Sequence, residues 1–123
     1  MKKILVVDDE AGFTRMVKLN LEKTGRFAVR IVNDSMQAIE TMRVFKPDLA
    51  LLDIVMPDLD GGDLVAQMKA DFELREIPIL MLTALVSPSE TGGQPTTKRG
   101  DLTMIAKPVS LPDLLKAIEQ KLN

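Results

Sequence analysis

Short apolar runs that stop abruptly at a polar residue constrain this 123-residue chain more than any other feature. The runs 4–7, 49–52 and 79–82 hold no polar side chain, which is typical of strands buried on both faces. Two further segments, 27–32 and 104–106, also fit strands. Segments with helical periodicity separate most of these runs. This alternation predicts an α/β fold, with a parallel sheet covered by helices on both faces.

The predicted helices show apolar residues at intervals of three or four positions. The first covers residues 12–23. The second follows Asp34 and Gln37, whose spacing is that of a capping box. Ser110 is expected to cap the last helix. The expected inner faces of the second, third and last helices are, in turn, Ala38, Ile39, Met42 and Phe45; Leu64, Val65, Met68 and Phe72; and Leu111, Leu115, Ile118 and Leu122.

The segment 87–101 breaks this pattern. It contains no Ala, Val, Leu, Ile, Met or Phe, and it holds three Gly and two Pro. A helix there would have no apolar face to bury, and interior Pro costs about 3 kcal/mol relative to Ala. We therefore expect mostly loop in this segment, with at most one helical turn.

Composition excludes several classes of function. With no His and no Cys, the chain cannot build a Ser-His-Asp triad, a thiolate metal site or a disulfide. Its 16 Lys and Arg against 18 Asp and Glu give a net charge of −2, which provides no basic footprint for nucleic acid or membrane surfaces. No apolar run approaches a membrane span or a signal peptide. We expect residues 1–123 to form one cytoplasmic domain.

Polar residues whose side chains can bind ions or take part in reactions follow the predicted strands directly: Asp8, Asp9, Asp53, Thr83 and Lys107. In open α/β sheets, ligands bind at the carboxyl ends of the strands. If the strands 4–7 and 49–52 are neighbours, the three aspartates converge, and their mutual repulsion calls for a cation. With oxygen ligands alone, Mg²⁺ is the natural ion, and Mn²⁺ is the related possibility.

These strand-end residues, read with their neighbours, resemble the receiver domain of two-component response regulators. The similarity rests on the run from Ile4 to Glu10, on Leu51–Pro57 with Asp60-Gly61, on Leu82-Thr83-Ala84 and on Lys107-Pro108. The resemblance implies a flavodoxin-like, doubly wound, five-stranded parallel sheet with strand order 2-1-3-4-5. The family's fourth helix would here be degenerate or replaced by the loop 87–101.

The resemblance also implies a role for each matched position. Asp53 would accept a phosphoryl group from a sensor histidine kinase or phosphotransfer protein, and the chain would then act on a downstream protein target. Mg²⁺ would be held by Asp8, Asp9, Asp53 and the backbone carbonyl of Val55. Thr83 and Lys107 would contact the phosphoryl group. Such a domain is regulatory rather than an enzyme. Apolar Val55 and Leu85 beside the path of attacking water imply slow self-dephosphorylation.

Two other classes remain open. One is a receiver-fold interaction module that binds its partner whatever the state of Asp53. The other is a Mg²⁺-dependent phosphohydrolase with an aspartyl nucleophile. The phosphohydrolase requires an Asp-x-Asp after its strand, whereas this chain has Asp8-Asp9-Glu10 and Asp53-Ile54-Val55. A nucleotide-binding domain is disfavoured, because no glycine-rich loop follows the first strand.

Overall fold

The computed structural model describes residues 1–83, 96–99, 102–106 and 110–122. Among these residues, six strands form one sheet in the order β2-β1-β3-β4-β6-β5. The strands are β1 (Lys2–Val7), β2 (Phe27–Val32), β3 (Leu49–Asp53), β4 (Ile79–Thr83), β5 (Thr96–Arg99) and β6 (Leu102–Ala106). The first five in spatial order are parallel neighbours. The predicted α/β class and the 2-1-3-4-5 order of parallel strands are therefore confirmed, with β6 as the predicted fifth strand.

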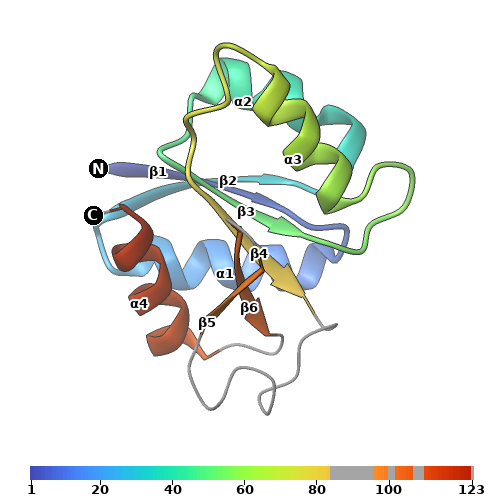
Figure 1. The fold of residues 1–123 in the computed structure, drawn as a ribbon. Coiled ribbons are helices and arrows are strands. Elements are labelled where there is room, and N and C mark those ends of the chain that lie inside the picture. Colours follow the sequence, from blue (N-terminus) through green and yellow to red (C-terminus); the bar gives the residue numbers. More distant parts are fainter. Residues whose placement is uncertain (84–95, 100–101, 107–109, 123) are drawn as a thin grey trace.

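Helices cover both faces of the sheet (Figure 1), as strands buried on both sides require. They are α1 (Ala11–Lys23), α2 (Ala38–Phe45), α3 (Gly61–Ala70) and α4 (Leu111–Leu122), with the short 3₁₀ helix η1 (Ser35–Gln37) before α2. Helices α2 and α3 lie on one face, and α1 and α4 lie on the other. No helix among the described residues is long and apolar enough to cross a bilayer.

The two faces of the sheet divide the core into two clusters. In β1, Leu5 and Val7 pack with α2 and α3, whereas Ile4 and Val6 pack with α1 and α4. This alternation follows from the two-residue period of a strand. It explains why the run from Ile4 to Val7 has no polar position, since all four side chains are fully buried.

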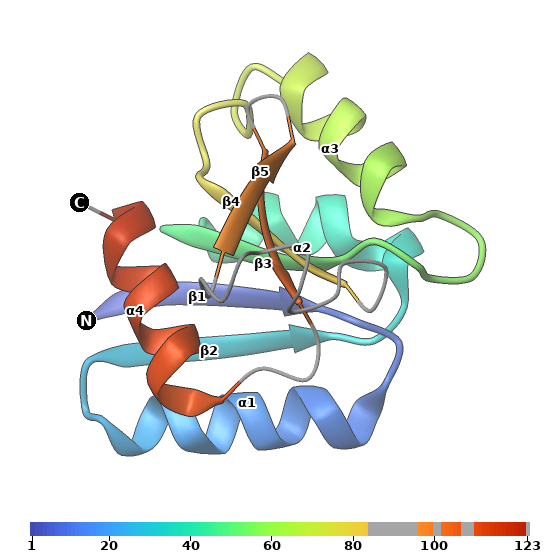
Figure 2. The same ribbon diagram turned by 60° about the horizontal axis from the view of Figure 1, so that its bottom comes forward.

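The segment 87–101 was predicted to be mostly loop, and this prediction is wrong for residues 96–99. These residues form β5, an edge strand that pairs antiparallel with β6 in the register Thr97↔Met104. Figure 2 shows β5 beside β6. The pairing of β5 with β6 is made by backbone groups, which every residue type except Pro supplies in full, so a strand can form without the apolar run that marks a strand buried on both faces. The rest of the predicted loop, residues 87–95 and 100–101, lies outside the described residues.

Two local predictions differ in detail. The Asp34 side chain accepts a hydrogen bond from the N–H of Met36, so it caps η1, and α2 begins only at Ala38. Phe72 was placed on an inner helical face, but α3 ends at Ala70 and Phe72 is 81% exposed. Ser110 does cap α4, since its hydroxyl accepts from the N–H of Asp113 at 3.3 Å.

Candidate functional site: an acidic cluster at the strand ends

Two buried carboxylates lie at the carboxyl ends of adjacent strands. Asp8 follows β1 and is fully buried, and Asp53 ends β3 and is 5% exposed. The pairing of β1 with β3, with Val7 opposite Leu52, brings these two ends together. The predicted convergence of Asp8 and Asp53 therefore occurs in the structure, and it follows directly from the strand order.

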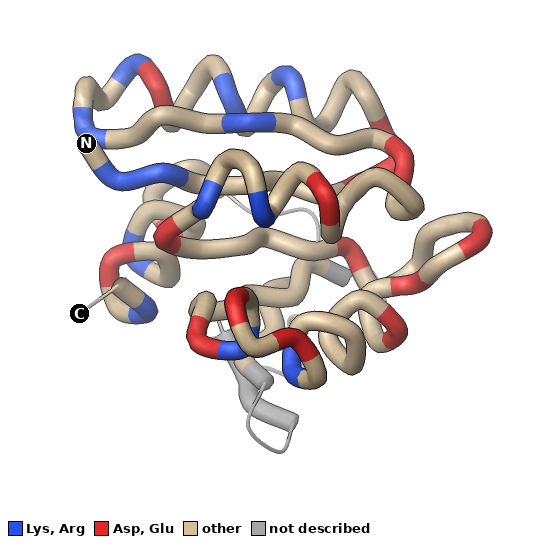
Figure 3. Tube along the Cα trace, turned by 90° about the horizontal axis from the view of Figure 1, so that it is seen from above, with Lys and Arg blue, Asp and Glu red and all other residues tan. Residues whose placement is uncertain are grey.

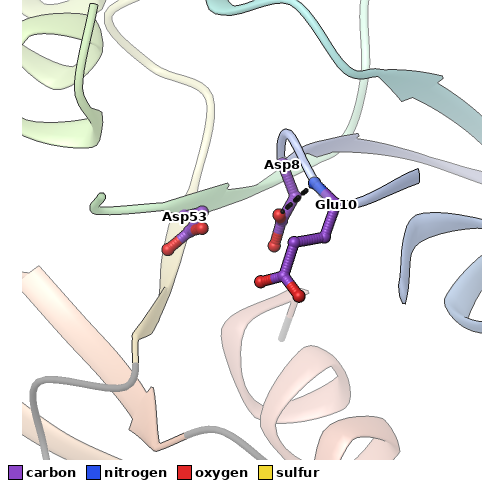
Figure 4. A group of neighbouring side chains, drawn as sticks. All are labelled: Asp8, Glu10 and Asp53. Atoms are coloured by element: carbon purple, nitrogen blue, oxygen red, sulfur yellow. Dashed lines mark hydrogen bonds between the residues drawn. The ribbon is translucent and has the colours of Figure 1, made fainter. Parts of the chain in front are cut away.

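Glu10 is the third member of this acidic cluster. One carboxylate oxygen from each of Asp8, Glu10 and Asp53 lies within 4.8 Å of the others. Figure 4 shows Asp8 and Glu10 leaving the same turn beside Asp53. Asp9, the predicted ligand between them, is exposed and is not one of the three grouped residues. Sequence reasoning passed over Glu10, although it stands directly after the two aspartates.

Backbone contacts fix the turn after β1. The N–H of Glu10 donates to Asp8 Oδ1 at 2.9 Å, which folds residue 10 back toward residue 8. The N–H of Asp8 donates to the Val32 carbonyl at 3.1 Å, continuing the ladder to β2. Asn33 then donates from Nδ2 to the Asp8 carbonyl at 2.8 Å and to the Thr14 hydroxyl at 3.0 Å. Asn33, which no sequence pattern singles out, thus links β2 and α1 to this turn.

The loop after β3 positions Asp53 from the other side. The N–H of Val55 donates to Asp53 Oδ1 at 3.3 Å, and the N–H of Ile54 donates to the Leu82 carbonyl at 3.3 Å. The buried Ser35 hydroxyl donates to the Pro57 carbonyl at 3.1 Å and accepts from the N–H of Leu59 at 3.3 Å. The loop is therefore attached both to η1 and to β4.

Gly61 completes the support of Asp53. A Cβ at this position would lie 2.5 Å from the Asp53 carbonyl oxygen, 2.7 Å from Met81 Cε and 2.9 Å from Ile54 Cα. The N–H of Gly61 also donates to the Ile54 carbonyl at 2.9 Å. The first turn of α3 therefore packs against the peptide of Asp53, and only glycine permits this close approach.

Of the other predicted site residues, Thr83 and Val55 lie within the described part of the chain. Thr83 is the last residue of β4, next to β3 in the sheet, which agrees with its expected position at the same edge as Asp53. Lys107 and Leu85 lie outside the described residues. Val55 is 59% exposed, in the loop directly after Asp53.

The acidic cluster fits a hard divalent cation. All three groups offer carboxylate oxygens, the ligand type that Mg²⁺ prefers. Asp8 and Asp53 are buried close together. Two like charges at such a distance raise the free energy of the folded state unless positive charge lies nearby. Figure 3 shows that Asp and Glu also gather in the turns at the end of the molecule opposite the N-terminus. The strand ends are thus an acidic edge.

Comparison with known proteins agrees with this geometry. The family described as response regulator receiver domain matches residues 4–119. The chain is 29% identical to the polar-differentiation response regulator DivK of Brucella anthropi, over 99% of this chain and 97% of that protein. It is 41% identical to the alkaline phosphatase synthesis transcriptional regulatory protein PhoP of Bacillus subtilis over 83 residues, which are 68% of this chain.

PhoP is longer, and the match covers 33% of it. The same holds for the DNA-binding response regulator MtrA of Mycobacterium tuberculosis, which is 39% identical over 68% of this chain and 35% of its own length. The chain thus spans about a third of the length of these curated relatives.

Solved structures show the same architecture. Chemotaxis protein CheY4 of Vibrio cholerae superposes with a TM-score of 0.82 at 27% identity, covering 98% of both chains. A CheY-like receiver domain protein of Methanospirillum hungatei gives a TM-score of 0.79 at 30% identity, over 99% of this chain and 94% of that one. Since the family match extends over nearly the whole sheet and includes both strands that carry the buried aspartates, this chain belongs to the response regulator receiver domains of two-component systems.

Proposed function

We propose that this receiver domain, over residues 1–123, accepts a phosphoryl group on Asp53 from a phosphohistidine of a sensor kinase or phosphotransfer protein. The observation that carries the proposal is the convergence of buried Asp8 and Asp53, together with Glu10, at the ends of adjacent strands. The family match supports this class of reaction. Phosphorylation would then change how the domain binds a downstream protein.

The transfer requires positioning more than proton chemistry. A carboxylate oxygen of Asp53 attacks phosphorus, the P–N bond breaks with its electron pair staying on the donor imidazole, and that nitrogen takes up a proton from solvent. In phosphoryl transfer, catalysis comes mainly from alignment and charge neutralisation. The Val55 N–H on Asp53 Oδ1 and the packing of Gly61 hold the attacking group in place. No general base within this chain is needed.

Mg²⁺ or Mn²⁺ would be held by Asp8, Asp9, Asp53 and the backbone carbonyl of Val55, as in similar receiver domains. When bound, the cation neutralises charge on the phosphoryl oxygens. The roles proposed for Thr83 and Lys107 are contacts to those same oxygens. The position of Thr83 at the end of β4, beside β3, is consistent with this proposal.

Intact-mass measurement after incubation with acetyl phosphate and Mg²⁺ tests the proposal. We expect a gain of one phosphoryl group in the parent and none in Asp53→Asn. Asp58→Asn is a matched control, because it removes one exposed negative charge from the loop after β3 and Asn readily adopts the positive φ of 68° found there. A parent that gains no mass, or an Asp53→Asn variant that does, would contradict the proposal and favour a phosphorylation-independent interaction module.

A further inference from the structure

Glu10 stands at the N-cap position of α1 but does not cap the helix. Its backbone is extended, with φ −86° and ψ 96°, and its side chain makes no capping hydrogen bond. Ser, Thr, Asp and Asn are the residues that stabilise this position, because a short side chain can accept from the first turn. The sequence therefore places a side chain here that does not serve the start of the helix.

The Glu10 carboxylate lies instead with those of Asp8 and Asp53, with one oxygen of each within 4.8 Å of the others. Asp8 and Asp53 are buried and Glu10 is exposed, so Glu10 forms the solvent side of the acidic cluster. Asp9 precedes it in the same turn but is not among the three grouped residues. The turn closed by the Asp8 side chain thus places the negative charge of Glu10 beside the buried Asp8 and Asp53.

The charge of Glu10 has opposite effects on the two species that this site would handle. It attracts a divalent cation held by Asp8 and Asp53, and it repels an incoming phosphoryl group, which adds roughly −2 charge. Even in a medium as polar as water, a unit charge about 5 Å from a divalent ion changes its binding roughly ten-fold. A bound cation offsets this repulsion of the phosphoryl group.

We propose that Glu10 is the outer carboxylate of the cation site: it strengthens divalent-cation binding and makes phosphorylation of Asp53 more dependent on the cation. This inference rests on the proposed function, because it assumes that the cation lies with Asp8 and Asp53. It assigns to Glu10 a role that the pattern of two aspartates and an acceptor does not include.

Mn²⁺ binding tests this inference without relying on activity. The chain has no Trp and no Tyr, so free Mn²⁺ is best followed by its electron paramagnetic resonance signal during a titration. We expect Glu10→Gln to weaken Mn²⁺ binding roughly ten-fold. The control Asp58→Asn removes the same charge from an exposed loop, and screening by salt should limit its effect to less than about two-fold.

A second variant separates the cation role from a structural one. Glu10→Ser supplies a preferred N-cap residue, so it should raise the thermal midpoint while weakening Mn²⁺ binding as Glu10→Gln does. A residue needed only for the helix would move both quantities in the same direction. In EDTA, both variants should accept a phosphoryl group from acetyl phosphate at least as readily as the parent.

The outcomes distinguish this inference from the proposed function. If Glu10→Gln and Glu10→Ser bind Mn²⁺ as tightly as the parent while Asp53→Asn does not, the assignment of Glu10 is wrong and the cation site stands. If Asp53→Asn also binds Mn²⁺ normally, the cation site itself is misplaced and both proposals fail.

Discussion

Gly61 is the residue whose smallness the site depends on most directly. Because a Cβ at Gly61 would overlap the Asp53 carbonyl oxygen at 2.5 Å, Gly61→Ala must displace either the start of α3 or the end of β3. We expect a loss of roughly 1–3 kcal/mol in the free energy of unfolding, the usual cost of overpacking. We also expect slower phosphorylation by acetyl phosphate. Urea unfolding and intact mass measure these two effects.

Gly12 provides the control for this prediction. It lies in α1, and an added Cβ there would meet nothing within 4 Å. Gly12→Ala should therefore raise the free energy of unfolding by about 0.5–1 kcal/mol through helix propensity. Equal stability changes of the same sign in the two variants would contradict the contact described for Gly61.

Val55 is expected to affect the lifetime of the phosphorylated state. It follows Asp53 by two positions and is 59% exposed, and its apolar side chain cannot orient an attacking water. Val55→Asn should shorten the lifetime of the acyl phosphate, while Val55→Ala, which adds no polar group, should not. The decay of the phosphorylated mass after removal of acetyl phosphate measures both. A parent lifetime of seconds would contradict the prediction.

At the scale of elements, an ion pair ties α2 to the end of α3. Arg43 donates from Nη2 to Asp71 Oδ2. This hydrogen bond lowers the pKa of Asp71 below its ordinary value and raises that of Arg43. An acid with a lowered pKa in the folded state stabilises the protein above its unfolded pKa, and that stabilisation is lost as the pH falls through the folded pKa.

Asp71→Asn should therefore lower the urea midpoint at pH 7, and the difference from the parent should shrink once the pH falls below the ordinary Asp pKa of about 3.9. Glu76→Gln is the control, since the Glu76 carboxylate lies 4.0 Å from Arg75 and is 92% exposed. A deficit in Asp71→Asn that is the same at pH 7 and pH 3 would rule out the ion pair as its cause.

The capping box of α3 is the second device at this scale. Asp60 accepts from the N–H of Asp63 at 2.9 Å, and Asp63 accepts from the N–H of Asp60. Because α3 packs against the Asp53 peptide through its first turn, Asp60→Ala should cost about 1 kcal/mol in unfolding free energy. It should also increase amide exchange at the start of α3. Exchange confined to the far end of the helix would contradict this link.

At the scale of the whole molecule, the five parallel strands could be predicted and the antiparallel edge strand β5 could not. The run from Ile4 to Val7 and the run from Leu49 to Leu52 must be apolar because helices cover both of their faces, and this requirement is visible in sequence. Residues 96–99, Thr-Thr-Lys-Arg, carry no such mark. Their strand depends on the backbone of β6, a partner that sequence periodicity does not reveal.

Only part of the acidic cluster could likewise be predicted from the sequence. Asp8 and Asp53 could be placed together once their strands were taken as neighbours. Whether Asp9 or Glu10 joins them depends on the turn between β1 and α1, in which Asp8 Oδ1 accepts from the N–H of Glu10. Phe72 was misplaced for a related reason, because the backbone leaves the helix at Asp71 (φ −98°, ψ 123°) and Phe72 then contacts Arg75 at 4.8 Å.

The position of β1 between β2 and β3 also has a consequence for the order in which the molecule is made. Both partners of β1, β2 and β3, precede β4 in the sequence, and so do all three members of the acidic cluster. Chains synthesised from the N-terminus begin to fold in that direction. A chain that emerges from its N-terminal side therefore exposes Asp8 and Glu10 well before Asp53, and the outer edge of β3 finds its partner only when β4 follows.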